Sequence, residues 1–368
     1  MSGPTLTHRE RVERALAHET TDRPPRDFAA EPDVWRRLRA HYRTDSHEEI
    51  LRAFDTDCRI VSYDWEAFFR PPDTPADAPR AHRAWKRPLA SDSYLDPWGA
   101  RRTITVNEYS TYEELSDYPL AGAESVEDLA RYAWPSPDWW DFSQLRAVIE
   151  RVNPNREYHL RWRCGSIFET AWSLRGFDRM LLDLVVAPDI AGYIMDRILE
   201  IHLENLARVM AAAGDLIDMV YTYDDVASQQ ALLMSADMWG QLIRPRQERL
   251  FAAAKGYGKP LMLHCCGAVA PLIDELIDLG LDVLNPVQPL AAGMDLERLK
   301  ERYGDRLTFH GGIDIQELLP RGTPKQVRRE VERVTGILGR DGGYILAPAH
   351  HVQADTPVEN VLALYGLS

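Results

Sequence analysis

The sequence predicts an α/β protein built as a (β/α)8 TIM barrel, with an N-terminal helical extension and a small β-hairpin insertion. Short apolar strand candidates alternate with amphipathic stretches, helix starts are well marked, and polar residues gather where the strand candidates end. Alternating strands and helices indicate a parallel sheet, because each parallel crossover needs a connection about the length of a helix. We expect residues 1–368 to form a single domain of this kind.

The strand candidates are short, apolar and followed by polar residues. Six lie in the second part of the chain, at residues 160–164, 219–223, 260–264, 282–285, 307–310 and 344–347. Two more fit near residues 27–29 and 59–63. Eight strands favour a closed barrel over an open doubly wound sheet. The sequence has no glycine-rich dinucleotide fingerprint after an early strand and no Walker A motif, which argues against nucleotide-binding folds.

Capping patterns mark the helix starts. Thr7 to Glu10 reads as a capping box, and Thr323, followed by a proline and a glutamine, repeats that device. Thr356 stands before another proline near the C-terminus. Residues 94–108 are typical of a β-hairpin that decorates the barrel, and residues 71–80, rich in Pro, Asp and Ala, are typical of a loop.

Composition narrows the cellular setting and the partners. The net charge of −14 argues against nucleic acid and anionic membranes, which reward clusters of Lys and Arg. No stretch approaches the roughly 20 apolar residues of a membrane span, and no secretory signal begins the chain. The four cysteines are too few and too scattered for a disulfide framework, so we expect a cytoplasmic protein.

His264 and Cys266 form the sharpest chemical signal. Residues two apart on an extended chain point to the same side, so both can face the barrel mouth while Cys265 faces away. Imidazole nitrogen and thiolate sulfur suit zinc, and a His-x-Cys pair with one distant ligand leaves a coordination position open. His350 follows the last strand candidate and is the preferred third ligand, although His351 is the alternative. The alternative interpretation is that these residues bind no metal and are ordinary half-buried residues of a strand and a loop.

Further polar residues follow the same strand ends. We expect Asp225 and Glu169 to take part in catalysis, as acid–base groups or as a fourth metal ligand. An N-cap, a salt bridge or a helix-dipole interaction would also account for them. Ordinary loop or core hydrogen bonds are the alternative for the expected substrate-binding residues, which are Tyr223, Asn285, Gln288 and His310.

Nearly the whole chain resembles the uroporphyrinogen decarboxylase superfamily, whose fold is a single (β/α)8 barrel. The N-terminal helix from Thr7, Leu174 to Phe177 and the pair Asp224-Asp225 fit family patterns. The most specific stretches are His264-Cys265-Cys266-Gly267, Asp282-Val283-Leu284-Asn285-Pro286-Val287-Gln288, His310-Gly311-Gly312-Ile313-Asp314 and Gly342-Gly343-Tyr344-Ile345-Leu346-Ala347-Pro348.

The branch within the superfamily follows from a missing arginine element near the N-terminus. Decarboxylases proper carry an early Arg-Gln-Ala-Gly-Arg element that holds porphyrinogen carboxylates, and residues 26–32 lack it. The chain therefore resembles the corrinoid-dependent methyltransferases, including those that methylate coenzyme M. Thiol-methylating members bind zinc through His-x-Cys and a later cysteine; His350 stands in place of that cysteine, as a histidine does in decarboxylases proper. Two imidazoles and one thiolate would make the metal a stronger Lewis acid.

The resemblance implies a zinc-dependent methyltransferase that moves a methyl group between a small heteroatom substrate and a corrinoid. The chain shows no cobalamin-binding module, so methylcobalamin would come from a partner corrinoid protein or from solution. The alternatives are a decarboxylase or lyase of a small acid with Asp225 as proton donor, another metal-dependent reaction such as hydrolysis on the same barrel, and a binding protein without turnover.

Overall fold

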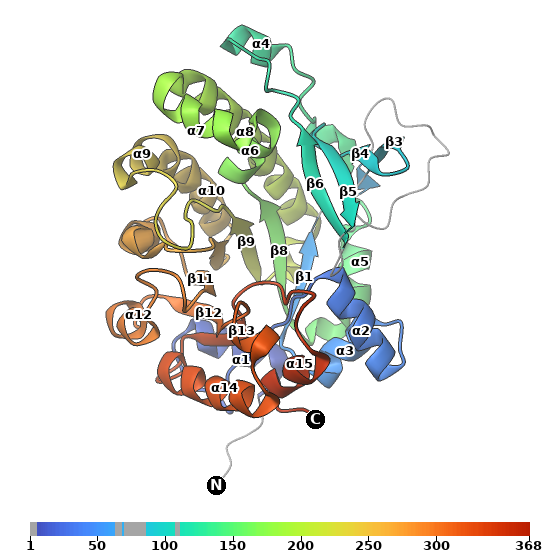
Figure 1. Ribbon diagram of the computed structural model, residues 1–368, viewed down its shortest axis with the longest axis vertical. Helices are drawn as coiled ribbons and strands as arrows, with labels where there is room; N and C mark the ends of the chain where they lie inside the picture. Colours follow the sequence, from blue (N-terminus) through green and yellow to red (C-terminus); the bar gives the residue numbers. More distant parts are fainter. Residues whose placement is uncertain (1–5, 63–67, 70–85, 107–110) are drawn as a thin grey trace.

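A computed structural model describes residues 6–62, 68–69, 86–106 and 111–368. Seven parallel strands form one curled sheet in the order β1-β8-β9-β10-β11-β12-β13 (Figure 1). They are β1 (Cys58–Ser62), β8 (His159–Gly165), β9 (Met219–Tyr223), β10 (Leu261–His264), β11 (Val283–Val287), β12 (Thr308–Ile313) and β13 (Tyr344–Pro348). Each coincides with a strand that the sequence predicts, with ends shifted by at most three residues.

The eighth position of the barrel is taken by the segment around residues 26–30. It forms parallel bridges from Arg26 to Leu346 and from Ala30 to Val352, beside β13. On its other side, the backbone N–H of Asp57 donates to the carbonyl of Arg26 at 2.8 Å, just before β1. The segment therefore closes the (β/α)8 barrel, although it pairs through isolated bridges and not as the continuous strand expected at residues 27–29.

Helices lie around the outside of the curled sheet (Figure 1). Among the described residues, no helix combines the length and the apolar character needed to cross a membrane. The α-helices are α1 (His8–Leu16), α2 (Pro32–Tyr42), α3 (His47–Ala53), α4 (Val126–Ala130), α5 (Leu145–Val152), α6 (Phe168–Arg175), α7 (Phe177–Val186), α8 (Pro188–Ala213), α9 (Ala236–Leu242), α10 (Arg244–Gly256), α11 (Ile273–Asp278), α12 (Leu296–Tyr303), α13 (Leu318–Arg321), α14 (Pro324–Leu338) and α15 (Val358–Leu364).

Two of the three expected caps form. The Thr7 and Thr323 side chains accept from the third backbone N–H of α1 and α14, and both capping boxes are complete. The third expectation is wrong. α15 begins at Val358 after Pro357, with no side-chain cap, and Thr356 is buried one residue too early to serve.

The insertion before β8 is larger than the predicted hairpin at residues 94–108. It is a four-stranded antiparallel sheet of β3 (Arg87–Ala90), β4 (Ser93–Leu95), β5 (Arg101–Val106) and β6 (Thr111–Asp117). β3 is exposed throughout and β6 is mostly exposed, so neither carries the apolar alternation by which a half-buried strand is recognised. A further short pair joins β2 (Phe68–Phe69) to β7 (Trp140–Asp141). The loop predicted at residues 71–80 lies outside the described residues.

The barrel interior is apolar at the end closed by α1 and polar above it. Val12 of α1 packs on Cys58 and Ile345, and Leu16 packs on a second group, Met219, Met262 and Val283. Higher in the barrel, the buried Arg161 guanidinium pairs with the Asp27 carboxylate at 2.6 Å. The aliphatic character of the strands therefore holds for their outward faces, whereas β8 turns charged side chains inward.

Candidate metal centre

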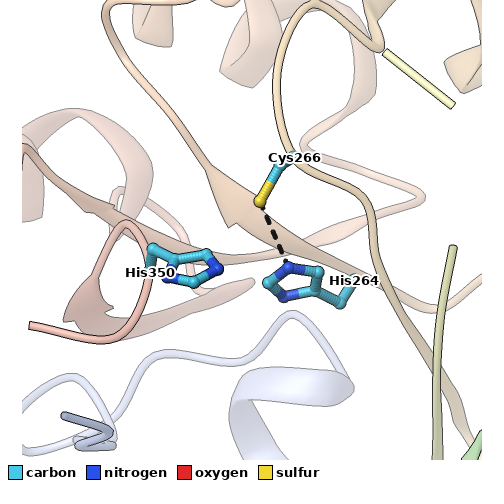
Figure 2. A group of neighbouring side chains, drawn as sticks. All are labelled: His264, Cys266 and His350. Carbon is cyan, nitrogen blue, oxygen red and sulfur yellow. Dashed lines mark hydrogen bonds between the residues drawn. The ribbon is translucent and has the colours of Figure 1, made fainter. Parts of the chain in front are cut away.

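Three side chains converge at the mouth of the barrel. His264 is the last residue of β10, Cys266 lies two residues further on, and His350 follows β13. Each offers a ligand atom within 4.8 Å of the others. Cys266 Sγ lies 3.2 Å from His264 Nε2, and the two imidazole rings are 5.3 Å apart between centroids. Figure 2 shows the three side chains pointing toward one another, His264 and Cys266 from the end of β10 and the residues just after it, and His350 from the loop after β13.

The chain around Cys266 explains this convergence. Cys265 is fully buried in the hydrophobic core outside the barrel, whereas Cys266 is half-buried and faces the mouth, as the alternation predicts. Gly267 then turns the chain with φ of +85°, where an added Cβ would lie 2.3 Å from the Ser228 carbonyl oxygen. Only glycine permits this turn so close to another backbone.

The protonation states of the three side chains suit a metal. Burial, with help from His350, lowers the pKa of His264 to about 3. Burial and His351 lower the pKa of His350 to about 4. Both imidazoles are therefore neutral at pH 7 and can offer a lone pair. Burial and the neighbouring Asp225 raise the pKa of Cys266, so the thiol keeps its proton until a cation displaces it.

Three carboxyl groups line the adjacent part of the mouth. The N–H of Asp225 donates to Glu169 Oε1 at 2.9 Å, and the N–H of Glu169 donates to Asp224 Oδ1 at 2.9 Å. Burial raises the pKa of Glu169 to about 8, with further contributions from Asp225 and Asp224. Burial also raises the pKa of Asp224, to about 7, and of Asp225. Glu169 and Asp224 can therefore hold protons near neutral pH.

Asp225 links this cluster to the metal ligands. Its Oδ1 accepts a hydrogen bond from the N–H of Cys266 at 2.7 Å and lies 3.9 Å from His264 Nε2. Of the two predicted catalytic carboxylates, Asp225 is thus beside the ligands, and Glu169 lies one hydrogen bond behind it. Their catalytic roles stay predictions.

The predicted substrate-binding residues occupy different places. Tyr223 ends β9, with the Arg163 guanidinium 4.3 Å from its ring centre. Gln288 Oε1 accepts from the N–H of Gly267 at 2.6 Å. Asn285 and His310 are buried below the mouth, and Asn285 Oδ1 lies 2.7 Å from His264 Nδ1. Their role in substrate binding stays a prediction.

The structure also brings in residues that the sequence reasoning missed. Arg163 lies beside Tyr223, and the Arg161–Asp27 pair lies deeper in the barrel. The sequence feature that could have revealed them is a pair of arginines, two residues apart, on a predicted strand that is otherwise mostly apolar. His351, the alternative ligand, is not part of the group of three ligand atoms, and its Nδ1 lies 3.4 Å from a Glu31 carboxylate oxygen.

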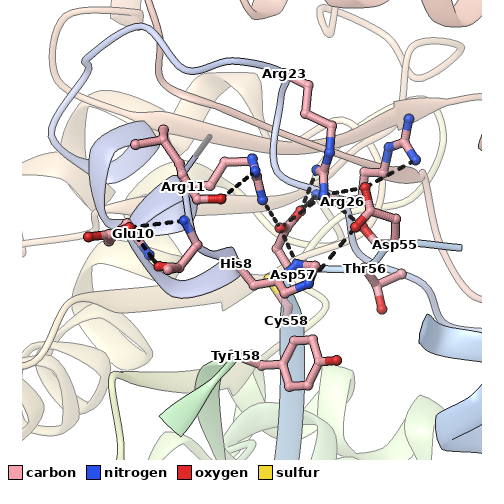
Figure 3. A network of polar contacts seen from close by, with 12 residues as sticks. His8, Glu10, Arg11, Arg23, Arg26, Asp55, Thr56, Asp57, Cys58 and Tyr158 are labelled. Atoms are coloured by element: carbon pink, nitrogen blue, oxygen red, sulfur yellow. Dashed lines mark hydrogen bonds and ion pairs between the residues drawn. The ribbon is translucent and has the colours of Figure 1, made fainter. Parts of the chain in front are cut away.

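A second polar cluster lies at the opposite end of the barrel, where a cavity of about 680 Å³ opens beside α1. Its centre is the buried Asp57 carboxylate, which accepts from Arg11 and Arg23 at 2.6 Å each and lies 2.8 Å from His8 Nδ1 (Figure 3). Because these charges compensate one another and lie where strands begin, we interpret the cluster as structural.

Comparison with known proteins places the chain in a family. Residues 117–367 match the family described as uroporphyrinogen decarboxylase (URO-D). The chain belongs to this family. It is 28% identical over 159 residues to the methylcobamide:CoM methyltransferase MtaA of Methanosarcina barkeri, covering 43% of this chain and 42% of that protein. It is 26% identical over 196 residues to a methylated-thiol–coenzyme M methyltransferase of Methanosarcina mazei, covering 53% and 49%.

A uroporphyrinogen decarboxylase of Thermus thermophilus is 29% identical over 167 residues, 45% of each chain. The chain thus spans somewhat less than half the length of the curated relatives it matches. A solved methyltransferase from Methanosarcina mazei superposes with a TM-score of 0.65 at 18% identity, over 98% of this chain and 97% of that one. The predicted family and barrel fold are confirmed, together with the resemblance to the methyltransferase branch.

Proposed function

We propose that this URO-D family member is a zinc-dependent methyltransferase that moves a methyl group between a small heteroatom substrate and a corrinoid. The observation that carries the proposal is the group of three ligand atoms, from His264, Cys266 and His350, at the mouth of the barrel. In a barrel enzyme the reacting groups lie at this end of the strands. The methyltransferases among the relatives support the reaction class.

The ligand set fits zinc. Two neutral imidazoles and one thiol within 4.8 Å suit a borderline cation and would leave one tetrahedral position open for a substrate. Zinc bound there would lower the pKa of a coordinated thiol, hydroxyl or amine, or polarise the heteroatom of a methyl donor. We propose methylcobalamin, carried by a partner corrinoid protein, as the second reactant.

The carboxyl groups beside the ligands can accept or supply the proton that methyl transfer to or from a heteroatom requires. When a heteroatom accepts the methyl group from cobalt, the cobalt keeps the bonding electron pair and the heteroatom loses its proton. Asp225 is placed to accept that proton because its carboxylate lies beside Cys266 and 3.9 Å from His264 Nε2. In the opposite direction, Asp225 would return the proton to the leaving heteroatom, while Glu169, which holds a proton at pH 7, accepts a hydrogen bond from the backbone N–H of Asp225 and supports its position.

The proposal is tested with the zinc-loaded protein and free methylcobalamin. A thiol such as coenzyme M, a phenol and an amine are offered in turn as acceptors, and the visible spectrum of the corrinoid is followed. We expect at least one acceptor to demethylate methylcobalamin, and His264→Ala to abolish the change while Cys265→Ala retains it. Release of carbon dioxide from a small carboxylic acid without a corrinoid, and no spectral change with any acceptor, would favour the decarboxylase alternative instead.

A further inference from the structure

A chain of hydrogen-bonded side chains runs from the metal centre down into the barrel. His264 Nδ1 lies 2.7 Å from Asn285 Oδ1, and Asn285 Nδ2 lies 2.6 Å from His310 Nδ1. His310 Nε2 in turn lies 2.8 Å from Asp27 Oδ2, and the Arg161 guanidinium pairs with the same carboxylate oxygen at 2.6 Å. Three residues, Asp27, His310 on β12 and Asn285 on β11, therefore connect Arg161 on β8 to a metal ligand on β10.

The Asp27–Arg161 pair, at the buried end of this row of side chains, decides which atom donates and which accepts in each of its hydrogen bonds. The Asp27 carboxylate, paired with Arg161, can only accept. Its contact with His310 Nε2 at 2.8 Å is much shorter than the 3.4 Å contact of Arg161 Nη1 with the same nitrogen, so His310 carries its proton on Nε2. The Nδ1 of a neutral His310 is then an acceptor and must receive a hydrogen from the Asn285 amide nitrogen. This orients the Asn285 amide with its oxygen toward His264, which must donate from Nδ1. The lone pair of His264 therefore lies on Nε2, the atom that faces Cys266.

We propose that Asn285, His310 and Asp27 are positioning residues that set the tautomer and ring orientation of His264 before any metal arrives. This inference rests on the proposed metal centre and assigns two residues a role other than substrate binding. Burial supports the assignment, because the three are only 4–7% exposed and their polar atoms are used within the chain. Loss of such a partner behind a metal-bound histidine lowers metal affinity by about 10–100-fold.

Each variant removes or restores one of the hydrogen bonds between Asp27 and His264. His310→Leu removes the acceptor for the Asn285 amide, leaves the Arg161–Asp27 pair in place and frees the amide to turn over. His310→Asn returns an acceptor oxygen near the position of Nδ1 and so restores the link to Asn285. Asn285→Leu removes the partner of His264 outright. The control is His159→Leu. His159 is equally buried on β8, and among the described residues no hydrogen bond joins its side chain to the side chains that run from Asp27 to His264.

The test has two readouts. In the metal-free protein, long-range nitrogen–proton NMR spectra of the imidazoles report which nitrogen of His264 carries the proton. Zinc affinity is measured separately by competition with a chelator. We expect the Nδ1–H form alone in the wild type, in His310→Asn and in His159→Leu. His310→Leu and Asn285→Leu should show the Nε2–H form as well, with zinc affinity about 10–100-fold lower.

Either of two results would overturn the inference: an Nε2–H tautomer of His264 in the wild type, or a His310→Leu variant that matches His159→Leu in both readouts. If Asn285→Leu does not fold, the two His310 variants still decide. The NMR readout needs no metal, so it tests the chain even if zinc does not bind. Failure of zinc binding in the wild type, with the expected tautomer, would refute the proposed function and leave the positioning chain intact.

Discussion

Replacement of Gly267 by alanine tests how the metal centre is built. The residue has φ of +85°, a conformation that costs a residue with a Cβ about 1–2 kcal/mol. The new methyl carbon would also lie 2.3 Å from the Ser228 carbonyl oxygen and 2.7 Å from its carbon. Both contacts are to backbone, so the loop must move, and forced overpacking of this kind costs about 1–3 kcal/mol. We therefore expect Gly267→Ala to lower the free energy of unfolding by about 2–5 kcal/mol.

The assay is urea unfolding of the metal-free protein, in which the midpoint should fall at an unchanged slope. Gly240→Ala is the matched control, because Gly240 lies within α9 and an added Cβ would have no neighbour within 4 Å. That variant should gain up to about 1 kcal/mol from better helix propensity. Zinc affinity should fall in Gly267→Ala and not in Gly240→Ala. A loss of stability below about 1 kcal/mol in Gly267→Ala would refute the reasoning.

Three further predictions concern protons and ligands. Burial raises the pKa of Glu169 to about 8, so between its ordinary value and pH 8 the folded protein holds a proton that the unfolded chain has lost. The stability of the metal-free protein should therefore fall relative to Glu169→Gln as pH rises through this window, and parallel stability curves would contradict this. Zinc binding at pH 7 should release a proton from Cys266 and none from the histidines, which are already neutral. Calorimetry in buffers of different ionisation enthalpy measures the release, and binding without any released proton would be inconsistent with the raised pKa of Cys266. His350→Cys should still bind zinc, with X-ray absorption showing two sulfur ligands, whereas an unchanged single-sulfur spectrum would mean that position 350 is not a ligand.

Much of the barrel could be predicted because its strands are buried by helices on their outer faces. Such strands read as short apolar runs, and all seven were found at nearly their true positions. The eighth position, around residues 26–30, is less distinct because its backbone pairs only through two bridges. The antiparallel sheet of β3 to β6 was underestimated for a similar reason: exposed strands such as β3 lack the apolar alternation that sequence reasoning relies on.

The site was partly predictable. Strand geometry alone predicts that His264 and Cys266, two residues apart, face the same side. It also predicts that Cys265 faces the opposite side, and Cys265 is buried in the core. The sequence favours His350 over His351 but leaves His351 open as the alternative, because the fold of the loop after β13 decides which imidazole lies beside His264 and Cys266. The contact of Asp27 with His310 joins residues 283 positions apart, and no local pattern reports such a pair.

The central claim is that His264, Cys266 and His350 together bind one zinc ion. The most direct test is the zinc content of the purified protein and of its single alanine variants, after equilibration with zinc and removal of the excess. The account predicts one zinc per chain in the wild type and in Cys265→Ala, and loss of zinc in His264→Ala, Cys266→Ala and His350→Ala. Stoichiometric zinc that survives in all three ligand variants, or its loss in Cys265→Ala, would contradict the account.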